Sequence, residues 1–208
     1  LLTAVNRLAT PTGPYEATDR WALAVRSENS TTPQELAVQL TTHATDELQR
    51  ARAIFRWITQ NITYDTDRAE AVSRHSISAV QLSPEEIYRR RSGVCEDYAI
   101  LFAAMAAAVG VRSEVVSGWG KTLADGLRSD LPAEPDHAWN AVRILGKWYL
   151  LDCTWAAGSA DERGVYQRRF DGFFFLTPPW QFVYTHLPED PRWQLLRVCP
   201  SRSGKLIG

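Results

Sequence analysis

The sequence lacks the long apolar run that a membrane-spanning helix needs. Its longest such run, residues 99–109, is far shorter than the roughly 18 residues that indicate a transmembrane helix. An excess of charge is also lacking, since 23 basic and 24 acidic residues leave a formal net charge of -1. Such a balance gives no electrostatic reason to expect nucleic acid or an anionic membrane surface as a partner. We therefore expect neither a membrane span nor a nucleic-acid partner.

Cysteine is scarce as well. The three cysteines, Cys95, Cys153 and Cys199, show neither CxxC spacing nor a dense pattern, so we expect no disulfide framework and at least one free thiol. The first residue is Leu1 rather than methionine, which fits a trimmed chain or a mature form that has lost a leader. The compartment, cytoplasmic or exported, and the oligomeric state therefore stay open.

What is present is the composition of a folded soluble protein. Hydrophobic residues make up 45% and charged residues 23% of the 208 positions, close to the averages for globular domains. This length suits one domain with extensions better than two large domains. We predict an N-terminal extension at residues 1–30, a core at residues 31–160 and a C-terminal extension at residues 161–208 that packs on the core.

Helix signals dominate the first half of the chain. Thr32 and Ser83 each precede a proline, which is favoured at the first helical position. Residues 95–109 are nearly all apolar or small and are followed by Gly110, which indicates a helix buried on most sides. Residues 65–83 look irregular. We predict helices over residues 33–40, 45–61, 84–91 and 95–109.

Strand signals follow the last of these helices. We expect strands at residues 111–119, 138–145 and 148–152, the last two joined by a turn at Gly146 and Lys147. A helix followed by antiparallel strands predicts an α+β fold.

Cys95 stands at the predicted start of the fourth helix. The unpaired N–H groups and the dipole of a helix N-terminus favour an anionic sulfur, and the backbone N–H there can stabilise the oxyanion of acyl transfer. Gly93 permits a tight approach, and the carboxylates of Glu96 and Asp97 are expected to point to solvent. Taken alone, Cys95 would be an ordinary small buried residue, but its surroundings indicate a nucleophile.

Two further residues would complete a nucleophilic site. His137 stands at the head of one predicted strand and Asp152 ends the next, where a buried acid needs a partner. With Gly146 and Lys147 as the turn, Asp152 lies opposite Ala141, four positions from His137. Contact between them therefore requires a bulge, a longer turn or a diagonal approach.

A metal site is the competing chemistry for these residues. Its ligands would be Cys95, His137, Asp152 and Cys153. Neighbouring residues 152 and 153 point to opposite sides of a strand, and the sequence has no CxxC or HxxxH pair. We therefore predict no metal.

Four segments resemble the transglutaminase-like superfamily, in the family's order of Cys, His and Asp. They are GVCEDYA at residues 93–99, VVSGW at 115–119, HAWN at 137–140 and WYLLDCTW at 148–155. Three later segments resemble its kyphoscoliosis-peptidase branch, namely FFFLT at residues 173–177, YTHLPED at 184–190 and WQLL at 193–196. The resemblance covers residues 52–196.

The resemblance implies a papain-like α+β fold with a transglutaminase core, in which the helix at Cys95 packs on an antiparallel sheet that brings His137 and Asp152 together. Carried over by position, Cys95 forms a thioester with a glutamine side chain or a peptide acyl group. His137 then moves the proton and Asp152 orients the imidazole. This chemistry requires no cofactor, and the sequence has no acidic loop of the kind that binds calcium.

Further assignments concern the surroundings of these residues. Gln81 is the candidate for the side-chain member of the oxyanion hole, with a solvated loop residue as the alternative. Tyr98, Trp119 and Trp139 are expected to line the cleft, although large aromatic residues more often fill a core. His186 is expected to pack or cap in the C-terminal extension.

The sequence thus predicts a cysteine-dependent acyl-transfer enzyme that acts on peptide, glutamine or isopeptide amides of a protein or peptide substrate. Hydrolysis and amine transfer share the thioester, and the choice depends on whether the cleft excludes water. The alternative is a non-catalytic protein-interaction module on the same fold. An intact set of nucleophile, base and orienting acid favours retained chemistry, and equal labelling of all cysteines would favour the module.

Overall fold

The first half of the chain is mainly helical. The structure is a computed structural model that describes residues 13–73, 80–121, 132–161, 163–197, 199–200 and 206–207. No helix within these ranges has the length and apolar character to cross a membrane. The first-half elements are α1 (Glu16–Ala24), η1 (Ser27–Asn29), α2 (Pro33–Leu40), α3 (Glu47–Asn61), β1 (Thr63–Tyr64), α4 (Thr66–Ser73), α5 (Pro84–Arg90), β2 (Ser92–Gly93) and α6 (Cys95–Ala108).

The second half is mainly strands with short helices between them. Its elements are β3 (Ser113–Gly120), β4 (His137–Ile144), β5 (Lys147–Leu151), α7 (Cys153–Ala157), β6 (Gly158–Ala160), β7 (Tyr166–Arg168), η3 (Gly172–Phe174), β8 (Phe175–Thr177), α8 (Pro179–Phe182), β9 (His186–Pro188), η4 (Pro191–Gln194), β10 (Cys199–Pro200) and β11 (Leu206–Ile207).

The helices begin where the capping signals predict. The Thr32 hydroxyl accepts the N–H of Glu35 at 3.2 Å at the start of α2. At the start of α5, Ser83 and Glu86 form a reciprocal capping box. The four predicted helices are present as α2, α3, α5 and α6. Helix α4 was not predicted, because the polar sequence around it gives no helical periodicity; its Arg68 is held by an ion pair with Asp97 of α6.

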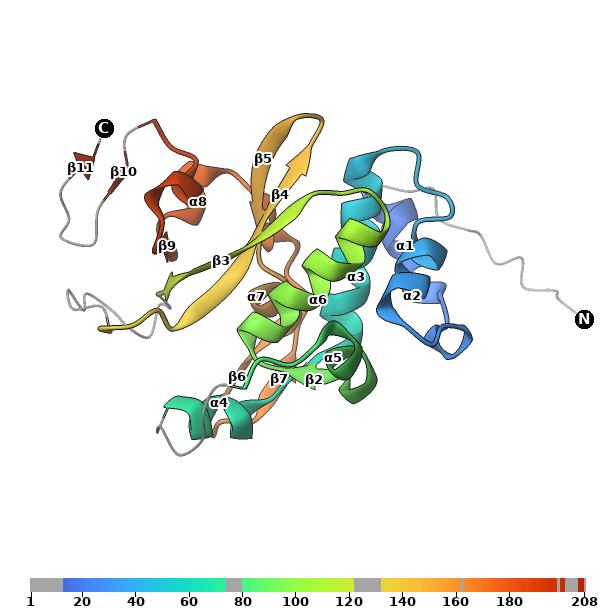
Figure 1. Ribbon diagram of the computed structural model, residues 1–208, viewed down its shortest axis with the longest axis horizontal. Coiled ribbons are helices and arrows are strands. Elements are labelled where there is room, and N and C mark those ends of the chain that lie inside the picture. Colours follow the sequence, from blue (N-terminus) through green and yellow to red (C-terminus); the bar gives the residue numbers. More distant parts are fainter. Residues whose placement is uncertain are drawn as a thin grey trace, which may run out of the picture.

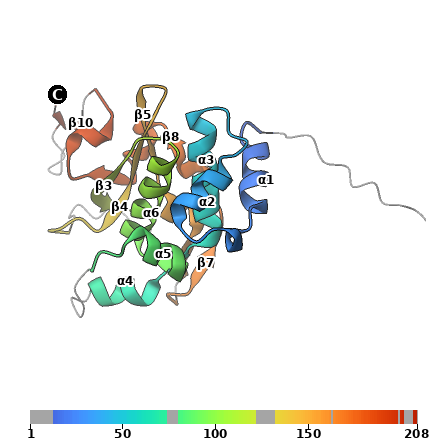
Figure 2. The same cartoon turned by 45° about the vertical axis from the view of Figure 1, so that its right-hand side comes forward.

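A five-stranded antiparallel sheet in the order β8-β5-β4-β3-β9 forms the centre of the molecule. Val142 and Ile144 of β4 pack into the main core with α3 and α6. Trp139 and Ala141, on the opposite face, pack with Phe182 of α8. Figures 1 and 2 show α1, α2 and α3 on one side of this sheet and the segment that carries α8 and β10 on the other. The predicted α+β fold, with the Cys95 helix against an antiparallel sheet, is confirmed.

The edge strands β8 and β9 come from residues beyond 161 and belong to the same sheet as β3 to β5. At the other end of the chain, Asp19 of α1 binds the guanidinium of Arg52 in α3 through two hydrogen bonds of 2.6 and 2.7 Å. The division into two extensions and a core stays a prediction.

The turn between β4 and β5 corrects the predicted register. Leu145 and Gly146 are the two turn residues, with φ of 49° and 81°, and positive φ at both positions is typical of a type I′ hairpin turn. The prediction of Gly146 and Lys147 was therefore wrong. Because Asn140 pairs with Leu151, the register extended by one residue places Asp152 opposite residue 139. Asp152 is thus two positions from the head of β4 rather than four.

Candidate active site

Cys95 is the first residue of α6, and its part-exposed side chain is a free thiol. The first N–H groups of a helix have no partner within the helix and remain available to an anion. A Cβ on Gly93 would lie 2.6 Å from Cβ of Asp97, so the close approach of Asp97 requires glycine at this position.

Asp97 does not point to solvent, contrary to the prediction. Its side chain is 1% exposed, its Oδ2 accepts the N–H of Val94 at 2.8 Å, and it forms an ion pair with Arg68. The physical reason is that a carboxylate at the third helical position can reach back to the N–H that precedes the helix. Asp97 therefore fixes the start of the helix that carries Cys95.

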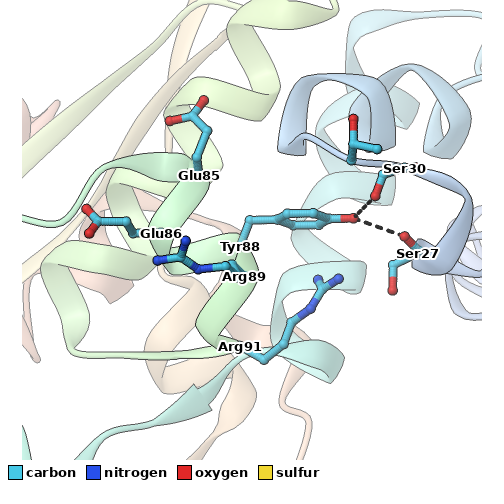
Figure 3. A pocket seen from close by; sticks show the side chains of 8 residues that line it. Ser27, Ser30, Glu85, Glu86, Tyr88, Arg89 and Arg91 are labelled. Carbon is cyan, nitrogen blue, oxygen red and sulfur yellow. Dashed lines mark hydrogen bonds between the residues drawn. The ribbon is translucent and has the colours of Figure 1, made fainter.

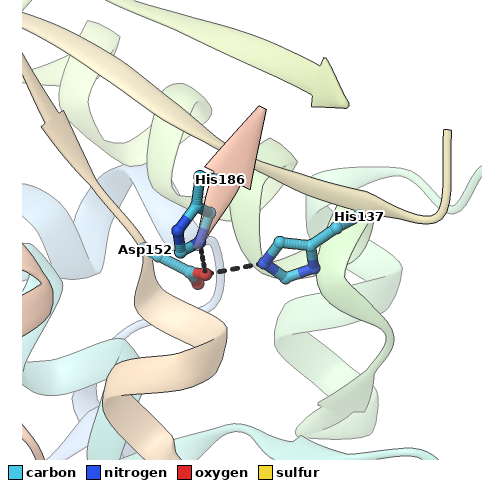
Figure 4. A group of neighbouring side chains, drawn as sticks. All are labelled: His137, Asp152 and His186. Carbon is cyan, nitrogen blue, oxygen red and sulfur yellow. Dashed lines mark hydrogen bonds and ion pairs between the residues drawn. The ribbon is translucent and has the colours of Figure 1, made fainter. Parts of the chain in front are cut away.

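His137 and Asp152 meet through their side chains, as Figure 4 shows. Nε2 of His137 lies 2.7 Å from Oδ2 of Asp152. His137 opens β4, whereas Asp152 follows β5 and caps α7. Of the three geometries that the sequence left open, the structure has the diagonal approach between neighbouring strands.

The pair is buried and carries opposite charges. Burial acts to lower the pKa of His137, but the charge and hydrogen bond of Asp152, and then a hydrogen bond with Cys95, raise it to about 10. Burial likewise acts to raise the pKa of Asp152, yet the two histidines at its carboxylate hold that pKa well below its usual range. Since Nε2 of His137 is engaged by Asp152, Nδ1 is the nitrogen left for the thiol of Cys95.

A second histidine, His186, reaches the same carboxylate oxygen. Its Nε2 lies 3.0 Å from Oδ2 of Asp152, and its side chain is fully buried. Sequence reasoning expected packing or capping of His186 and missed this contact. The packing is present, because the ring stacks on Phe182 at a centroid distance of 3.9 Å.

The three predicted cleft residues are all buried. Tyr98 is 1% exposed and donates its hydroxyl to the carbonyl of Ile62 at 2.9 Å, so it belongs to the core, and its assignment to the cleft is corrected. Trp139 is 1% exposed, with its ring centroid 5.8 Å from that of His137. Trp119 is 6% exposed and its indole N–H donates to the carbonyl of Pro132 at 3.0 Å.

Trp155 was missed by sequence reasoning and lies closer to the histidines. Its ring centroid is 5.2 Å from that of His137 and 4.5 Å from that of His186. A Cβ on Gly120 would lie 3.1 Å from Trp155 and 3.2 Å from His137. These contacts form an aromatic wall beside the imidazole of His137, which limits its rotation.

Two side chains lie near Cys95 as candidate oxyanion donors. Gln81 is exposed, and its amide donates to the carboxylate of Glu96 at 3.3 Å. Tyr64, which the sequence did not single out, pairs with Gly93 through β1 and β2. Burial, and next the negative charge of Cys95, raise the pKa of Tyr64. Its hydroxyl therefore keeps its proton and can donate.

Within the described ranges, His137, Asp152 and His186 bring potential metal-ligand atoms within 4.8 Å of one another. Both Nε2 atoms already lie at hydrogen-bond distance from the one carboxylate oxygen, which accounts for the grouping. In the alternative ligand set, Cys153 is 2% exposed in the main core, and burial raises its pKa well above the ordinary value. The metal-free site stays a prediction.

A hollow of about 330 Å³ lies elsewhere, between η1 and α5 (Figure 3). The hydroxyl of Tyr88 donates there to the carbonyls of Ser27 and Ser30 at 3.1 and 3.0 Å. No predicted site residue is among those that line it in the described part of the chain, which are Ser27, Ser30, Thr31, Glu85, Glu86, Tyr88, Arg89 and Arg91. We therefore do not assign it to the Cys95 site.

Comparison with known proteins identifies the class. The family model of the transglutaminase-like superfamily matches residues 34–153, more than half of the chain. The chain therefore belongs to the transglutaminase-like superfamily, which confirms the resemblance.

More particular similarities point to one branch. Kyphoscoliosis peptidase of Mus musculus is 35% identical over 164 residues, which cover 78% of this chain and 24% of the relative. Kyphoscoliosis peptidase of Homo sapiens is 34% identical over 184 residues, which cover 88% of this chain and 27% of the relative. The chain thus spans about a quarter of the length of these relatives. A distant solved structure, a TGase, is 18% identical with a TM-score of 0.42, and the match covers 81% of this chain and 38% of that one.

Proposed function

We propose that this chain is a cysteine-dependent acyl-transfer enzyme acting on peptide, glutamine or isopeptide amides. Cys95 is the nucleophile, His137 carries the proton and Asp152 orients the imidazole. The observation that supports this most is the buried contact of 2.7 Å between Nε2 of His137 and Oδ2 of Asp152. This contact leaves Nδ1 of His137 for a thiol at a helix start, where a thiolate is stabilised.

The reaction follows from these positions. The thiolate of Cys95 attacks the carbonyl carbon of an amide, and the oxyanion is held by the backbone N–H of Cys95 together with a side-chain donor. The carbon–nitrogen bond then breaks as His137 gives its Nδ1 proton to the leaving amine. Water or a second amine attacks the resulting thioester and loses a proton to His137, and the thiolate of Cys95 leaves.

Hydrolysis is the outcome that the similarities favour. The relatives in mouse and human are named as peptidases, which supports a peptide bond as the substrate of this chain. The same thioester serves amine transfer when water is excluded, so the acceptor is left to experiment.

The first prediction concerns the reactivity of Cys95. We expect iodoacetamide at pH 7 to alkylate Cys95 at least about tenfold faster in the wild type than in His137→Ala, because the imidazolium stabilises the thiolate. Peptide mapping by mass spectrometry follows Cys95 and Cys153 separately. Cys153 is 2% exposed and serves as the unreactive reference within each sample. Equal Cys95 rates in the two proteins would contradict the proposal.

The reaction itself is tested with a peptide library and an amine donor, with Cys95→Ala as the matched control. Cleavage that depends on Cys95 would establish a peptidase, and amine incorporation a transferase. If Cys95 proves unreactive and no product forms, the non-catalytic interaction module takes the place of the enzyme.

A further inference from the structure

Asp152 has a full set of hydrogen bonds although its side chain is completely buried. Its Oδ1 accepts the backbone N–H groups of Thr154 and Trp155 at 2.7 and 3.0 Å. Its Oδ2 lies 2.7 Å from Nε2 of His137 and 3.0 Å from Nε2 of His186. Figure 4 shows the two imidazoles converging on this one oxygen from different elements. The mechanism above uses His137 and leaves His186 without a role.

The ring of His186 is fixed by its surroundings. It stacks on Phe182 at 3.9 Å with an interplanar angle of 20°, and its Nδ1 lies 2.8 Å from the hydroxyl of Thr185. That hydroxyl has a second, longer contact of 3.3 Å to the carbonyl of Phe182. The backbone is held as well, because β9 pairs with β3 through His186 and Gly120. Position and orientation of the ring are therefore set before any substrate binds.

The protonation of His186 follows from these contacts. Burial lowers its pKa to about 4, against the opposing effect of Asp152, so the ring is neutral near pH 7 and carries one proton. The carboxylate of Asp152 has no proton to give, so the proton of His186 must be on Nε2. Nδ1 then accepts from the hydroxyl of Thr185.

We propose that His186 is a positioning residue, whose Nε2–H holds Oδ2 of Asp152 where the same oxygen receives Nε2–H of His137. The inference rests on the proposed function, since it assigns His186 to the same site. The two backbone N–H groups fix Oδ1 but leave the carboxylate free to rotate about that oxygen. A donor on Oδ2 that takes no part in proton transfer fixes the plane of the carboxylate.

His186 also keeps the carboxylate satisfied during the reaction. When His137 gives up its Nδ1 proton, the buried charge of Asp152 loses its cationic partner. Unpaired buried charges are costly, and the neutral donors that remain, among them His186, reduce this cost.

The test compares His186→Gln with His186→Phe. Glutamine can offer an amide N–H near the position of Nε2, whereas phenylalanine keeps a flat ring on Phe182 without a donor. We measure Cys95 alkylation by iodoacetamide from pH 5 to 10, with His137→Ala as the reference for an unpaired thiol. In His186→Phe we expect a rate at pH 7 at least about tenfold below wild type and a profile displaced to higher pH, toward that of His137→Ala. In His186→Gln we expect a rate within about threefold of wild type.

Thr185→Val is the second variant, in case His186→Phe does not fold. Valine keeps the shape of threonine but removes the hydroxyl that donates to Nδ1, so His186 loses one of the contacts that hold its Nε2–H on Asp152. We expect the alkylation profile to move in the same direction as in His186→Phe, by a smaller amount. Urea unfolding of each variant shows which of them are folded.

The outcomes separate this inference from the proposed function. If Cys95 is alkylated no faster in the wild type than in His137→Ala, both the proposed function and the role of His186 are overturned. The role of His186 alone is overturned if Cys95 reacts fast in the wild type and folded His186→Phe has the same pH profile. If His186→Phe does not fold, an unchanged profile in Thr185→Val has the same meaning. A displaced profile that glutamine restores supports it, because loss of packing alone would not be reversed by an N–H donor.

Discussion

At the scale of single residues, Tyr64 and Gln81 are the two candidates for the side-chain donor of the oxyanion hole. Tyr64 and Gln81 are both near the start of α6, the first through its pairing with Gly93 and the second through Glu96. The amide of Gln81 already donates to a carboxylate at 3.3 Å. The hydroxyl of Tyr64 keeps its proton, because burial and the charge of Cys95 raise its pKa. These contacts favour Tyr64 over Gln81.

We therefore predict that Tyr64→Phe slows acylation of Cys95 by a reactive aryl ester about a hundredfold, the loss typical of one oxyanion donor. Gln81→Ala is expected to slow it less than about threefold. The release of the phenolate in a stopped-flow burst measures the step. Alkylation by iodoacetamide forms no oxyanion, so both variants should match wild type in that reaction. The opposite order of the two variants would return the role to Gln81.

Sequence reasoning reached part of this site. Cys95 followed from the helix signal around it, but the contact between His137 and Asp152 followed from the family resemblance. The predicted turn was displaced by one residue, which moved the residue opposite Asp152 by two positions. His186 lies 34 residues from Asp152 along the chain. Its role depends on how β9 pairs with β3, and no local pattern encodes that. Asp97 was misplaced because acids in a first helical turn either face solvent or form a capping box.

Among the elements, β9 approaches β3 closely at one glycine. A Cβ on Gly118 would lie 2.3 Å from the carbonyl oxygen of Leu187, 2.6 Å from the ring of Trp139 and 2.8 Å from Cα of Pro188. Since His186 begins β9, we expect a larger residue at position 118 to move that histidine away from Asp152. We therefore expect a change at this edge of the sheet to affect the contact between His186 and Asp152.

We predict that Gly118→Ala lowers the free energy of unfolding by about 1–3 kcal/mol, because β9 must move away from β3. Urea unfolding followed by fluorescence measures this, and Cys95 alkylation should slow in the same variant. Gly13→Ala is the control, since its added Cβ meets nothing within 4 Å. If stability and Cys95 alkylation are unchanged in Gly118→Ala, β9 accommodates the added methyl group without an effect on the site, and the prediction is wrong.

The long elements could be predicted and the short ones could not. Helices α2 and α5 carry capping signals, α3 has apolar periodicity, and α6 is an apolar run followed by Gly110; these signals were visible in the sequence. Strands β8 and β9 span Phe175–Thr177 and His186–Pro188, which is too short for alternation to be recognised. Their place at the two edges of the sheet comes from tertiary packing. Helix α4 likewise depends on a tertiary contact, the ion pair of its Arg68 with Asp97.

For the molecule as a whole, the two histidines at Asp152 give opposite dependences of stability on pH. The pKa of His186 falls from 6.5 in the unfolded chain to about 4, so between these values the unfolded state binds more protons and stability rises with pH. The pKa of His137 rises from 6.5 to about 10. Its contribution is therefore complete below pH 6.5 and is lost as pH rises toward 10. Asp152, whose pKa is lowered from 3.8, adds stability above that value and loses it as pH falls.

These signs predict a stability maximum near pH 6.5, with slopes on either side that belong to different residues. His186→Gln should remove the acid-side slope, which amounts to about 3 kcal/mol between pH 4 and 6.5, and should leave the alkaline side as in wild type. Urea unfolding at intervals from pH 4.5 to 9.5, with tryptophan fluorescence as the signal, gives the free energy of unfolding at each point.

His43→Gln, which alters an exposed histidine, is the matched control. Subtraction of the His43→Gln curve from the His186→Gln curve cancels every titrating group that both variants share. If His186→Gln keeps the slope that the wild type shows between pH 4 and 6.5, His186 is already charged in the folded protein over that range. Its donor role would then need no particular tautomer.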